Sequence, residues 1–462
     1  MLTSRISLTA LSAALASTLP AAAFAGTTAS VAADAEAGST ASSDPDAAGL
    51  SEIVVTSRRT RSVATVSGPE IQKILPGISP LKALQTLPGV TFLTADPWGN
   101  NEQNISLFVH GFSASQLGYT LDGIPLGDQT YGNYNGLSPQ RAIISENVGS
   151  VTLASGAGDL GTASTSNLGG TIDTFSSDPK KERGGEIQQT FGSYSAFRTY
   201  GRIDTGTFGN GNSLYLSGVR QDAKAWDFNG HQGGYQANAK FVHEDATGKL
   251  TLYGAYSDKT EPNEDASVVT TATQGSYPYK RPFFYPDFAG EEQYLASGAY
   301  KAAGSNYRNY YSDAQRTDYL AYAKYDWNIG AKVRWSNQAY YHHDDGVGVV
   351  AGPIDVAGLP GLFAKYFPNL TAAQTSAVFG GSGLATRTTE YRIDREGLLS
   401  TLHVDLGNHQ IEIGGWYEHQ SSSAYRRWYA FDIDNPSTPY DRPLDLAQPL
   451  ITQYHSEIRV DE

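Results

Sequence analysis

The chain has 462 residues, long enough for more than one domain, and a formal net charge of −14 at pH 7. This negative balance excludes the basic surface that nucleic-acid binding requires. The sequence contains no cysteine. Neither a disulfide framework nor a lipid-modified cysteine anchor is therefore available to it.

Residues 1–25 have the three parts of a signal peptide. Arg5 supplies the positive charge, Leu8–Leu19 the apolar run, and Ala23–Ala25 the small-residue cleavage site. The apolar run is too short to cross a bilayer as a helix, so we expect cleavage rather than anchoring. The chain is also rich in tyrosine (29 residues) and glycine (49 residues). This composition is typical of an exported outer-membrane β-barrel, and a secreted soluble β-protein remains compatible with it.

Residues 26–60 are predicted to be disordered, because alanine, serine, threonine, aspartate and glycine dominate them. Within this segment lies a short stretch that favours extended backbone: Glu52, Ile53, Val54, Val55, Thr56 and Ser57. Nothing beside it in the sequence offers a pairing strand. Its backbone groups are therefore predicted to be free to pair with the sheet edge of another protein.

Residues 61–178 are predicted to form a small α+β domain. One helix is expected over Ser79–Leu87, with Ser79 as its cap and Pro80 at the first helical position. The leucines that share one face of this helix are Leu81, Leu84 and Leu87. The expected strands are Ser106–Val109, Gly118–Leu121, Asn147–Ala154 and Gly170–Phe175.

Residues 184–462 alternate apolar and polar residues with the period of two that strands show. Tight turns are expected at 208–212, 245–248, 328–331 and 406–409. Much longer loops are expected at 223–234, 259–317, 343–390 and 420–452. Short and long connections that alternate are typical of an antiparallel transmembrane β-barrel, with short periplasmic turns and long extracellular loops. About nine or ten strands can be placed in this way.

Several blocks, in the expected order, resemble the plug domain of TonB-dependent outer-membrane receptors. Leu84–Val90 is similar to the plug helix and turn, and Thr120–Leu126 to a strand and turn of the plug. Val148–Leu153 with Gly169–Ile172 resembles its closing strands. Ahead of them, Glu52–Ser57 resembles the TonB box, which the periplasmic TonB protein captures as an added strand.

This resemblance implies a receptor in the Gram-negative outer membrane with its N-terminus in the periplasm. The family's barrels have about 22 strands around a plugged lumen, so the chain is expected to hold an incomplete barrel. The implied function is TonB-energised import of a scarce solute of the siderophore, vitamin or oligosaccharide class. The implied partners are TonB with its inner-membrane energising complex, outer-membrane lipid and a small-molecule or oligosaccharide ligand. No enzymatic activity, metal site or cofactor is expected.

Substrate contacts are expected, by analogy with the family, on polar-aromatic loops at the outer end of the plug and in one long loop. The candidate residues are Trp98, Asn100, Gln129, Tyr131, Tyr134 and Tyr285. The family usually has an arginine of a plug–barrel ion-pair network where this chain has His110. We interpret His110 as a structural substitution.

Other functions are weighed against this one. A passive porin would explain the barrel but not the plug blocks, and a surface-binding protein would need no TonB box. Gly156–Gly161 fits a nucleotide-binding glycine pattern, but a loop rather than a helix follows it, so we reject that site. His342 and His343 are potential metal ligands. Adjacent strand residues point to opposite faces, however, so the two do not easily share one ion.

Overall fold

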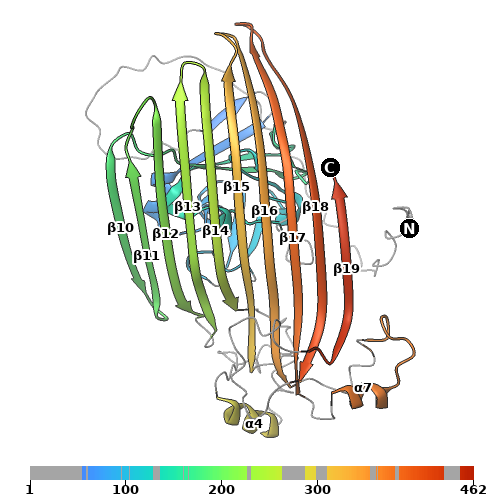
Figure 1. Ribbon diagram of the computed structural model, residues 1–462. Coiled ribbons are helices and arrows are strands. Elements are labelled where there is room, and N and C mark those ends of the chain that lie inside the picture. Colours follow the sequence, from blue (N-terminus) through green and yellow to red (C-terminus); the bar gives the residue numbers. More distant parts are fainter. Residues whose placement is uncertain are drawn as a thin grey trace, which may run out of the picture. The chain divides into compact units, whose positions relative to one another are not determined.

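The computed structural model shows a small mixed domain followed by one large antiparallel sheet (Figure 1). We call the small domain, residues 55–176, the plug, and the sheet of strands β10 to β19 the wall. The structure describes residues 55–58, 61–94, 96–102, 105–127, 136–159, 161–164, 166–225, 230–262, 287–297, 310–353, 361, 363–379, 384–430 and 448–462. The predicted signal peptide lies outside these residues.

A six-stranded sheet and a three-stranded sheet form the plug, with β1-β2-β8-β9-β6-β7 as the order of the larger one. The strands are β1 (Val55–Arg58), β2 (Arg61–Ser67), β3 (Val90–Leu93), β4 (Ser106–Val109), β5 (Phe112–Ser113), β6 (Gly118–Leu121), β7 (Ile124–Pro125), β8 (Val148–Ser155) and β9 (Gly170–Ser176). The helical elements are α1 (Gly68–Ile74), α2 (Pro80–Ala83), η1 (Leu84–Thr86), η3 (Ala114–Gln116), α3 (Pro139–Ala142) and η4 (Ser145–Asn147). Two predicted strands have the expected bounds, β8 is shifted by one residue at both ends, and β9 extends one residue further than predicted.

The predicted plug helix forms as the short α-helix α2, which tightens into the 3-10 turn η1. Its cap is the predicted one, because the Ser79 hydroxyl accepts a hydrogen bond from the Leu81 N–H at 3.2 Å. The leucines on the predicted face are all buried in the plug core: Leu81, Leu84 and Leu87. The spacing of the leucines thus correctly predicted both the helix and the face of it that is buried.

The wall has ten strands in the described residues, and each strand pairs with the next one along the chain. They are β10 (Arg183–Gly192), β11 (Ala196–Thr205), β12 (Asn212–Lys224), β13 (His231–Asp245), β14 (Gly248–Pro262), β15 (Tyr311–Asn328), β16 (Val333–Pro353), β17 (Leu384–Asp405), β18 (Gln410–Ala430) and β19 (Ile451–Asp461). All four predicted tight turns are confirmed. The helices α4 (Phe288–Ser297) and α7 (Ala372–Val378) lie at the opposite end of the wall from these turns (Figure 1).

The predicted long loops begin too early and end too late. β14 runs to Pro262, β16 to Pro353 and β18 to Ala430, while β17 already begins at Leu384. The loops predicted at 259–317, 343–390 and 420–452 therefore lose residues to strands at both ends. Only six residues, 225–230, separate β12 from β13 where 223–234 was predicted. These strand ends were missed because both of their faces carry polar or small residues, which hides the alternation of period two.

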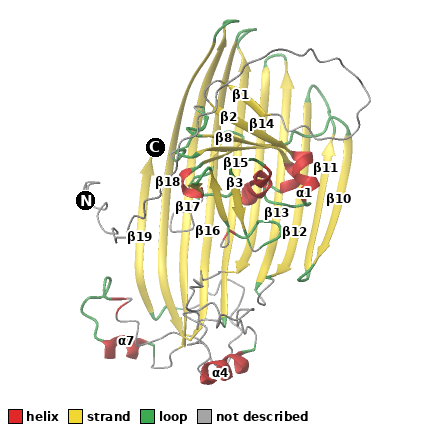
Figure 2. Cartoon of the chain, turned by 180° about the vertical axis from the view of Figure 1, so that it is seen from behind, coloured by secondary structure: helices red, strands yellow, loops and turns green. Residues whose placement is uncertain are grey.

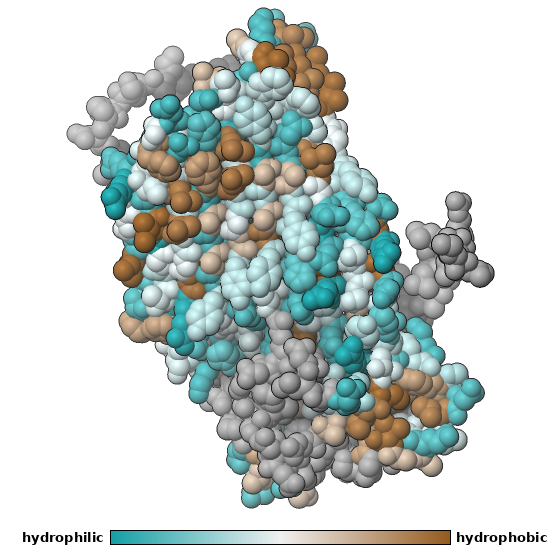
Figure 3. All heavy atoms as spheres, viewed as in Figure 1, coloured by the Kyte–Doolittle hydropathy of each residue, from teal (hydrophilic) through white to brown (hydrophobic). Residues whose placement is uncertain are grey.

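The two faces of the wall differ in chemistry. The plug elements β1, β2, β3, β8 and α1 lie on one side of it (Figure 2), and the wall tyrosines Tyr253, Tyr322 and Tyr340 belong to the plug's buried core. The opposite face carries exposed large apolar side chains: Ile187, Ile203, Leu216, Leu252, Trp327, Trp335, Leu398, Ile411 and Ile413. Figure 3 shows hydrophobic residues gathered over the half of this face nearer the tight turns. Among the described residues, no helix is both long and apolar enough to cross a membrane.

The expectation that the TonB-box segment has no pairing partner is wrong for the part that the structure describes. β1 contains Val55, Thr56 and Ser57, and it pairs antiparallel with β2. The strand β2 was not predicted because its run of alternating apolar and polar residues is short. β1 is nevertheless the outermost strand of the described sheet. Glu52, Ile53 and Val54 lie outside the described residues.

Candidate functional site at the plug–wall interface

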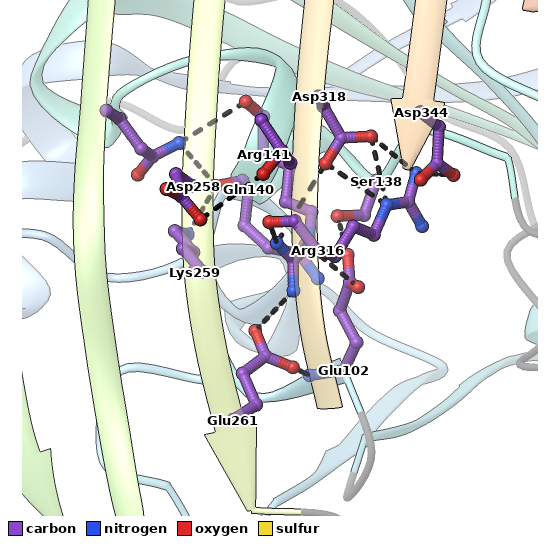
Figure 4. A network of polar contacts seen from close by, with 12 residues as sticks. Glu102, Ser138, Gln140, Arg141, Asp258, Lys259, Glu261, Arg316, Asp318 and Asp344 are labelled. Carbon is purple, nitrogen blue, oxygen red and sulfur yellow. Dashed lines mark hydrogen bonds and ion pairs between the residues drawn. The ribbon is translucent and has the colours of Figure 1, made fainter. Parts of the chain in front are cut away.

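A buried cluster of charges joins the plug to the wall (Figure 4). Its centre is Arg141, which α3 carries into the interface. The Arg141 guanidinium lies 2.8 Å from the Glu102 carboxylate of the plug. It also lies 3.1 Å from Glu261 on β14 and 3.9 Å from Asp318 on β15. One plug arginine therefore contacts carboxylates from both sides of the interface.

Burial makes this cluster energetically important. The Arg141, Glu261 and Asp318 side chains are each 2% exposed. Burial by itself would lower the pKa of Arg141, but the surrounding carboxylates outweigh it and hold that pKa above its ordinary value. Burial would likewise raise the pKa of Glu102, but the Arg141 and Arg316 guanidiniums outweigh it, so that pKa is lowered. Each plug group thus keeps its charge because of its partners.

The charge cluster continues along the wall. Arg316 lies 2.7 Å from Asp318 and 2.9 Å from Asp344 on β16, and it donates a 2.9 Å hydrogen bond to the Gly136 carbonyl of the plug. Lys259 donates to the Gln140 carbonyl at 2.9 Å. The neighbouring strands β14 and β15 therefore supply groups that hold the same stretch of the plug, and Asp344 of β16 pairs with one of these groups.

The predicted orientation of the histidine pair is confirmed, but the expectation that a loop begins at residue 343 is wrong. The two residues lie inside β16 rather than where a strand enters a loop. His342 is buried on the plug side, 3.2 Å from Asp318. His343 points to the other face and lies 2.7 Å from Asp394. Among the described residues, no group of three potential metal ligands of the His, Cys, Asp or Glu type comes together.

A second set of contacts lies along one cross-strand row of the wall. Tyr215, Lys240, Tyr253, Tyr322 and Tyr340 are successive neighbours on β12 to β16. The Tyr253 hydroxyl donates to the Ala142 carbonyl at 2.9 Å, and the Lys240 ammonium to the Ser176 hydroxyl at 2.8 Å. The Tyr322 hydroxyl donates to the Asp122 carboxylate at 2.8 Å. The row thus contacts the plug at several points along its length.

Asp122 shows why the plug needs its Asp-Gly turn. The backbone of Asp122 has φ +51° and that of the next residue, Gly123, φ +92°, a turn geometry that these residue types tolerate. The carboxylate accepts hydrogen bonds from the Ser176 N–H at 2.9 Å and from the Ser176 hydroxyl at 2.6 Å. Together with the bond from Tyr322, these contacts fix the β6–β7 turn to both β9 and the wall.

The predicted outer loop of the plug is held from within. The Asp96 carboxylate accepts hydrogen bonds from the backbone N–H groups of Trp98, Asn100 and Asn101. The Trp98 indole N–H donates to the Pro76 carbonyl at 3.1 Å, and its side chain is buried. The Asn100 amide donates to the Gly77 carbonyl at 3.1 Å. Both predicted contact residues therefore have roles within the fold, whatever they bind.

The remaining predicted substrate residues lie outside the described part of the chain: Gln129, Tyr131, Tyr134 and Tyr285. A cavity of about 430 Å³ opens beside Trp98, between the plug and the long-loop end of the wall. Its lining includes Leu75, Lys82, Trp98, Ala196, Lys224 and Gln232. The structure therefore places one of the two described candidates at a cavity.

His110 takes no part in the charge cluster. It is exposed and has a positive φ of 49°, and its backbone N–H donates to the Gly89 carbonyl at 2.8 Å. Arg141 supplies the plug cation instead. Sequence reasoning missed Arg141 because nothing in its local pattern distinguishes it from a surface arginine. Its partners Glu261 and Asp318 are far away along the chain.

Comparison with known proteins agrees with this geometry. Residues 56–171 match the family model described as TonB-dependent Receptor Plug Domain. The comparison with curated proteins finds no match. Among solved structures, FpvA of P. aeruginosa in complex with a heterologous pyoverdine and iron is similar, with a TM-score of 0.56 and 13% identity. That alignment covers 88% of this chain and 49% of FpvA.

Two further solved structures resemble the chain. The ferric-catecholate import receptor Fiu of E. coli has a TM-score of 0.52 and 15% identity, covering 79% of this chain and 47% of Fiu. The ferric citrate transporter FecA in its unliganded form has a TM-score of 0.55 and 14% identity, covering 82% of this chain and 50% of FecA. The chain thus spans about half the length of these structures.

Fold and interface together define a plug domain seated against an antiparallel wall. The chain carries the plug domain of TonB-dependent receptors and shares the fold of their plug and wall, as its sequence motifs indicated. The similar proteins are receptors and transporters rather than enzymes.

Proposed function

We propose that this protein is an outer-membrane receptor that imports a scarce solute with energy delivered by TonB. The observation that carries the proposal is the plug, which is fixed to the wall by buried charges on Arg141, Glu261 and Asp318. A passive porin needs no such obstruction in its lumen. A receptor that must open only when it is pulled needs a plug that stays closed in the absence of force.

The chemistry of the interface suits this role. Charged and polar groups that separate under force are solvated by incoming water, so the interface can open without exposing a large apolar surface. Desolvation offsets much of the Coulombic attraction while the groups are buried. The plug can therefore be held firmly at rest and still be rearranged by a moderate pull.

TonB would bind the segment Glu52–Ser57. Because β1 pairs only with β2 among the described strands, TonB could add a strand at the outer edge of β1 or displace β1 from β2. Either mode transmits force to β2, whose other neighbour is β8 in the centre of the plug sheet. Pulling on the box would therefore strain the sheet that carries the wall contacts.

The outward face of the wall supports a location in the outer membrane. Its outward face exposes apolar residues together with Trp327, Trp335, Tyr319 and Tyr341, the pattern of a lipid-facing band bounded by aromatic residues. We place the tight turns and the N-terminus in the periplasm. We also propose that the wall is part of a barrel of about 22 strands, as in plugged transporters of this architecture.

The solute belongs to the siderophore, vitamin or oligosaccharide class. The similar structures include a pyoverdine–iron complex and a ferric-catecholate receptor, which supports an iron chelate as the first candidate to test. The proposed contacts remain Trp98, Asn100, Gln129, Tyr131, Tyr134 and Tyr285. Since its amide already donates to the Gly77 carbonyl, Asn100 would contact the solute only through its remaining acceptor oxygen or after a loop rearrangement.

The test compares solute uptake by cells that produce the receptor or its Val54→Pro variant. Proline cannot donate a ladder hydrogen bond, so strand addition by TonB should fail. The matched control is Val54→Thr, which keeps a β-branched side chain and the N–H. We expect surface binding to survive in both variants and uptake to collapse only in Val54→Pro. Equal uptake by both variants, or by cells that lack TonB, would favour a passive porin.

A further inference from the structure

The cavity beside Trp98 has the composition of a binding site. Its apolar lining includes Leu75, Trp98, Ala196 and Ala223, which pack together where the plug meets β11 and β12. Its volume of about 430 Å³ falls within the range of about 300–1,000 Å³ that is usual for small-molecule sites. A group with a flat apolar body can therefore enter and remove apolar surface from water.

One polar side chain in this cavity has no partner. Gln232, on β13, is 7% exposed, and its Nε2 makes no hydrogen bond among the described residues. Leaving a buried N–H donor unsatisfied is unfavourable. Gln232 lines the cavity, and a turn of its terminal amide, whose donor is itself buried, would let an acceptor atom inside the cavity satisfy this donor.

The charges around the cavity are mainly positive. Among its described lining residues, the charged ones are Lys82, Lys224 and Asp96. The Asp96 carboxylate is occupied by backbone N–H groups of its own loop. The Lys82 ammonium donates to the Pro97 carbonyl at 2.6 Å, which holds it at the plug side of the cavity. Lys224 is exposed at the wall side.

We propose that this cavity binds a planar apolar group that bears a carboxylate or a similar oxyanion. The apolar walls take the body of the group, the Gln232 amide donates to one oxygen, and the two lysines balance the charge. Gln232 lies on the face of the wall that also carries Lys240 and Asn238, which contact the plug. The Gln232 end of the site therefore faces the plug side of the wall, and the occupant we propose is a water-soluble solute rather than a lipid chain.

This inference rests on the proposed function only for the source of the group, which would be part of the imported solute. Binding of a small aryl carboxylate to the purified receptor involves no TonB. Failure of the uptake test would leave this binding unchanged. Failure of binding would equally leave the effect of Val54→Pro unchanged.

The experiment measures binding of 2-naphthoate to the receptor in lipid nanodiscs by calorimetry, with empty nanodiscs as the blank. We expect 2-naphthoate to bind more tightly than the neutral 2-naphthamide. We also expect its affinity to fall as the ionic strength rises, because the lysine contribution is screened. Equal affinity for the acid and the amide, or no binding of either, would overturn the proposal.

The variants separate the proposed contacts from general damage to the fold. Gln232→Leu should weaken 2-naphthoate binding by about tenfold or more, because it removes a hydrogen bond to a charged acceptor. It should not lower the melting temperature, because it also removes an unsatisfied donor. Lys82→Gln and Lys224→Gln should each weaken binding several-fold and reduce its salt dependence. The matched controls Gln410→Leu and Lys332→Gln, near the tight turns, should bind as the unaltered receptor does.

Dodecanoate tests whether the group bound in the cavity comes from a lipid chain instead of from the imported solute. It carries the same carboxylate on a flexible acyl chain. Weaker binding of dodecanoate than of 2-naphthoate supports a planar solute group. A different pattern would overturn the proposal and assign the cavity to a lipid chain. In that pattern dodecanoate binds tightly, Gln232→Leu abolishes this binding, and 2-naphthoate does not bind. Unchanged 2-naphthoate affinity in Gln232→Leu would overturn the assigned contact.

Discussion

Replacement of Arg141 by methionine tests the role of the charge cluster most severely. Methionine keeps much of the volume of the side chain but removes its charge and all its donors. Three carboxylates lie within 4 Å of the guanidinium, at 2.8 Å (Glu102), 3.1 Å (Glu261) and 3.9 Å (Asp318). Removing one partner of a buried ion pair typically costs about 3–5 kcal/mol. Arg316 and Lys259 remain nearby and can compensate in part, so we expect the lower end of this range.

About 3 kcal/mol corresponds to roughly a hundredfold change in an equilibrium constant. The backbone N–H of Ile144 reports this change directly, because it donates to the Asn238 side chain of the wall at 2.8 Å and is protected only while the plug is seated. Hydrogen exchange at Ile144 should therefore accelerate about a hundredfold in Arg141→Met.

The control for this measurement is Lys180→Met. Its ion pair with Glu186, at 3.4 Å, is exposed on both sides (57% and 39%), and such pairs contribute little. Exchange at Ile144 should then match that of the unaltered protein. An exchange rate in Arg141→Met within about threefold of the unaltered rate would refute the claim that this cluster holds the plug.

Three further predictions follow from individual contacts. Tyr322→Phe removes the donor to Asp122 and should lower plug stability by about 1 kcal/mol, measured by urea unfolding; no change would mean that this bond is replaced by water. Ser79→Ala removes the cap of α2 and should also destabilise the plug by about 1 kcal/mol, whereas Ser79→Gly, a residue that N-caps tolerate, should retain most of the stability. The lowered pKa of Glu102 means that its stabilising effect is present above the ordinary Glu pKa of about 4.3 and is lost as the pH falls through the lowered value. The stability difference between the unaltered protein and Glu102→Gln should therefore be constant from neutral pH to about pH 5 and shrink below it; a difference that grows on acidification would contradict this sign.

The sequence predicted the plug elements well because their signals are local. The cap at Ser79 and the leucine spacing after it define a helix within nine residues, and the strands β4 and β6 have the expected bounds. The tight turns of the wall were predicted for the same reason. Glycine, asparagine and aspartate mark them directly in the sequence.

The outer halves of the wall strands could not be predicted in the same way. In β16, Asp344, Gly346 and Gly348 follow His342 on one face, and Asp345 follows His343 on the other, so the apolar alternation is interrupted before Val347. The charge cluster was also missed, because Glu102 and Glu261 are 159 residues apart. A pairing of this kind depends on the register of β14 and β15 against α3, which a single sequence does not reveal.

The pairing of β1 illustrates a different limit of structure prediction from the sequence. The prediction treated Glu52–Ser57 as a segment without neighbours, because the residues before it are low in complexity. Its partner β2 follows in the chain and pairs through Ala64 and Val63 with Val55 and Thr56. A short strand can therefore be available to an outside partner and still be paired inside its own domain.

The central claim is that the plug must be released from the wall for the solute to pass. The chain contains no cysteine, so the pair Asn147→Cys and Ser217→Cys would carry its only thiols. These side chains lie on opposite sides of the interface, with the Asn147 amide donating to the Ser217 hydroxyl at 2.7 Å.

Uptake by cells that produce this double variant should be measured with the two thiols joined, by oxidation or by a short bis-thiol linker, and again after reduction. Each single-cysteine variant serves as the control. The account predicts that the joined form binds the solute but does not import it, and that reduction restores import. Normal import by the joined form would show that the plug does not have to leave the wall, and would contradict the account.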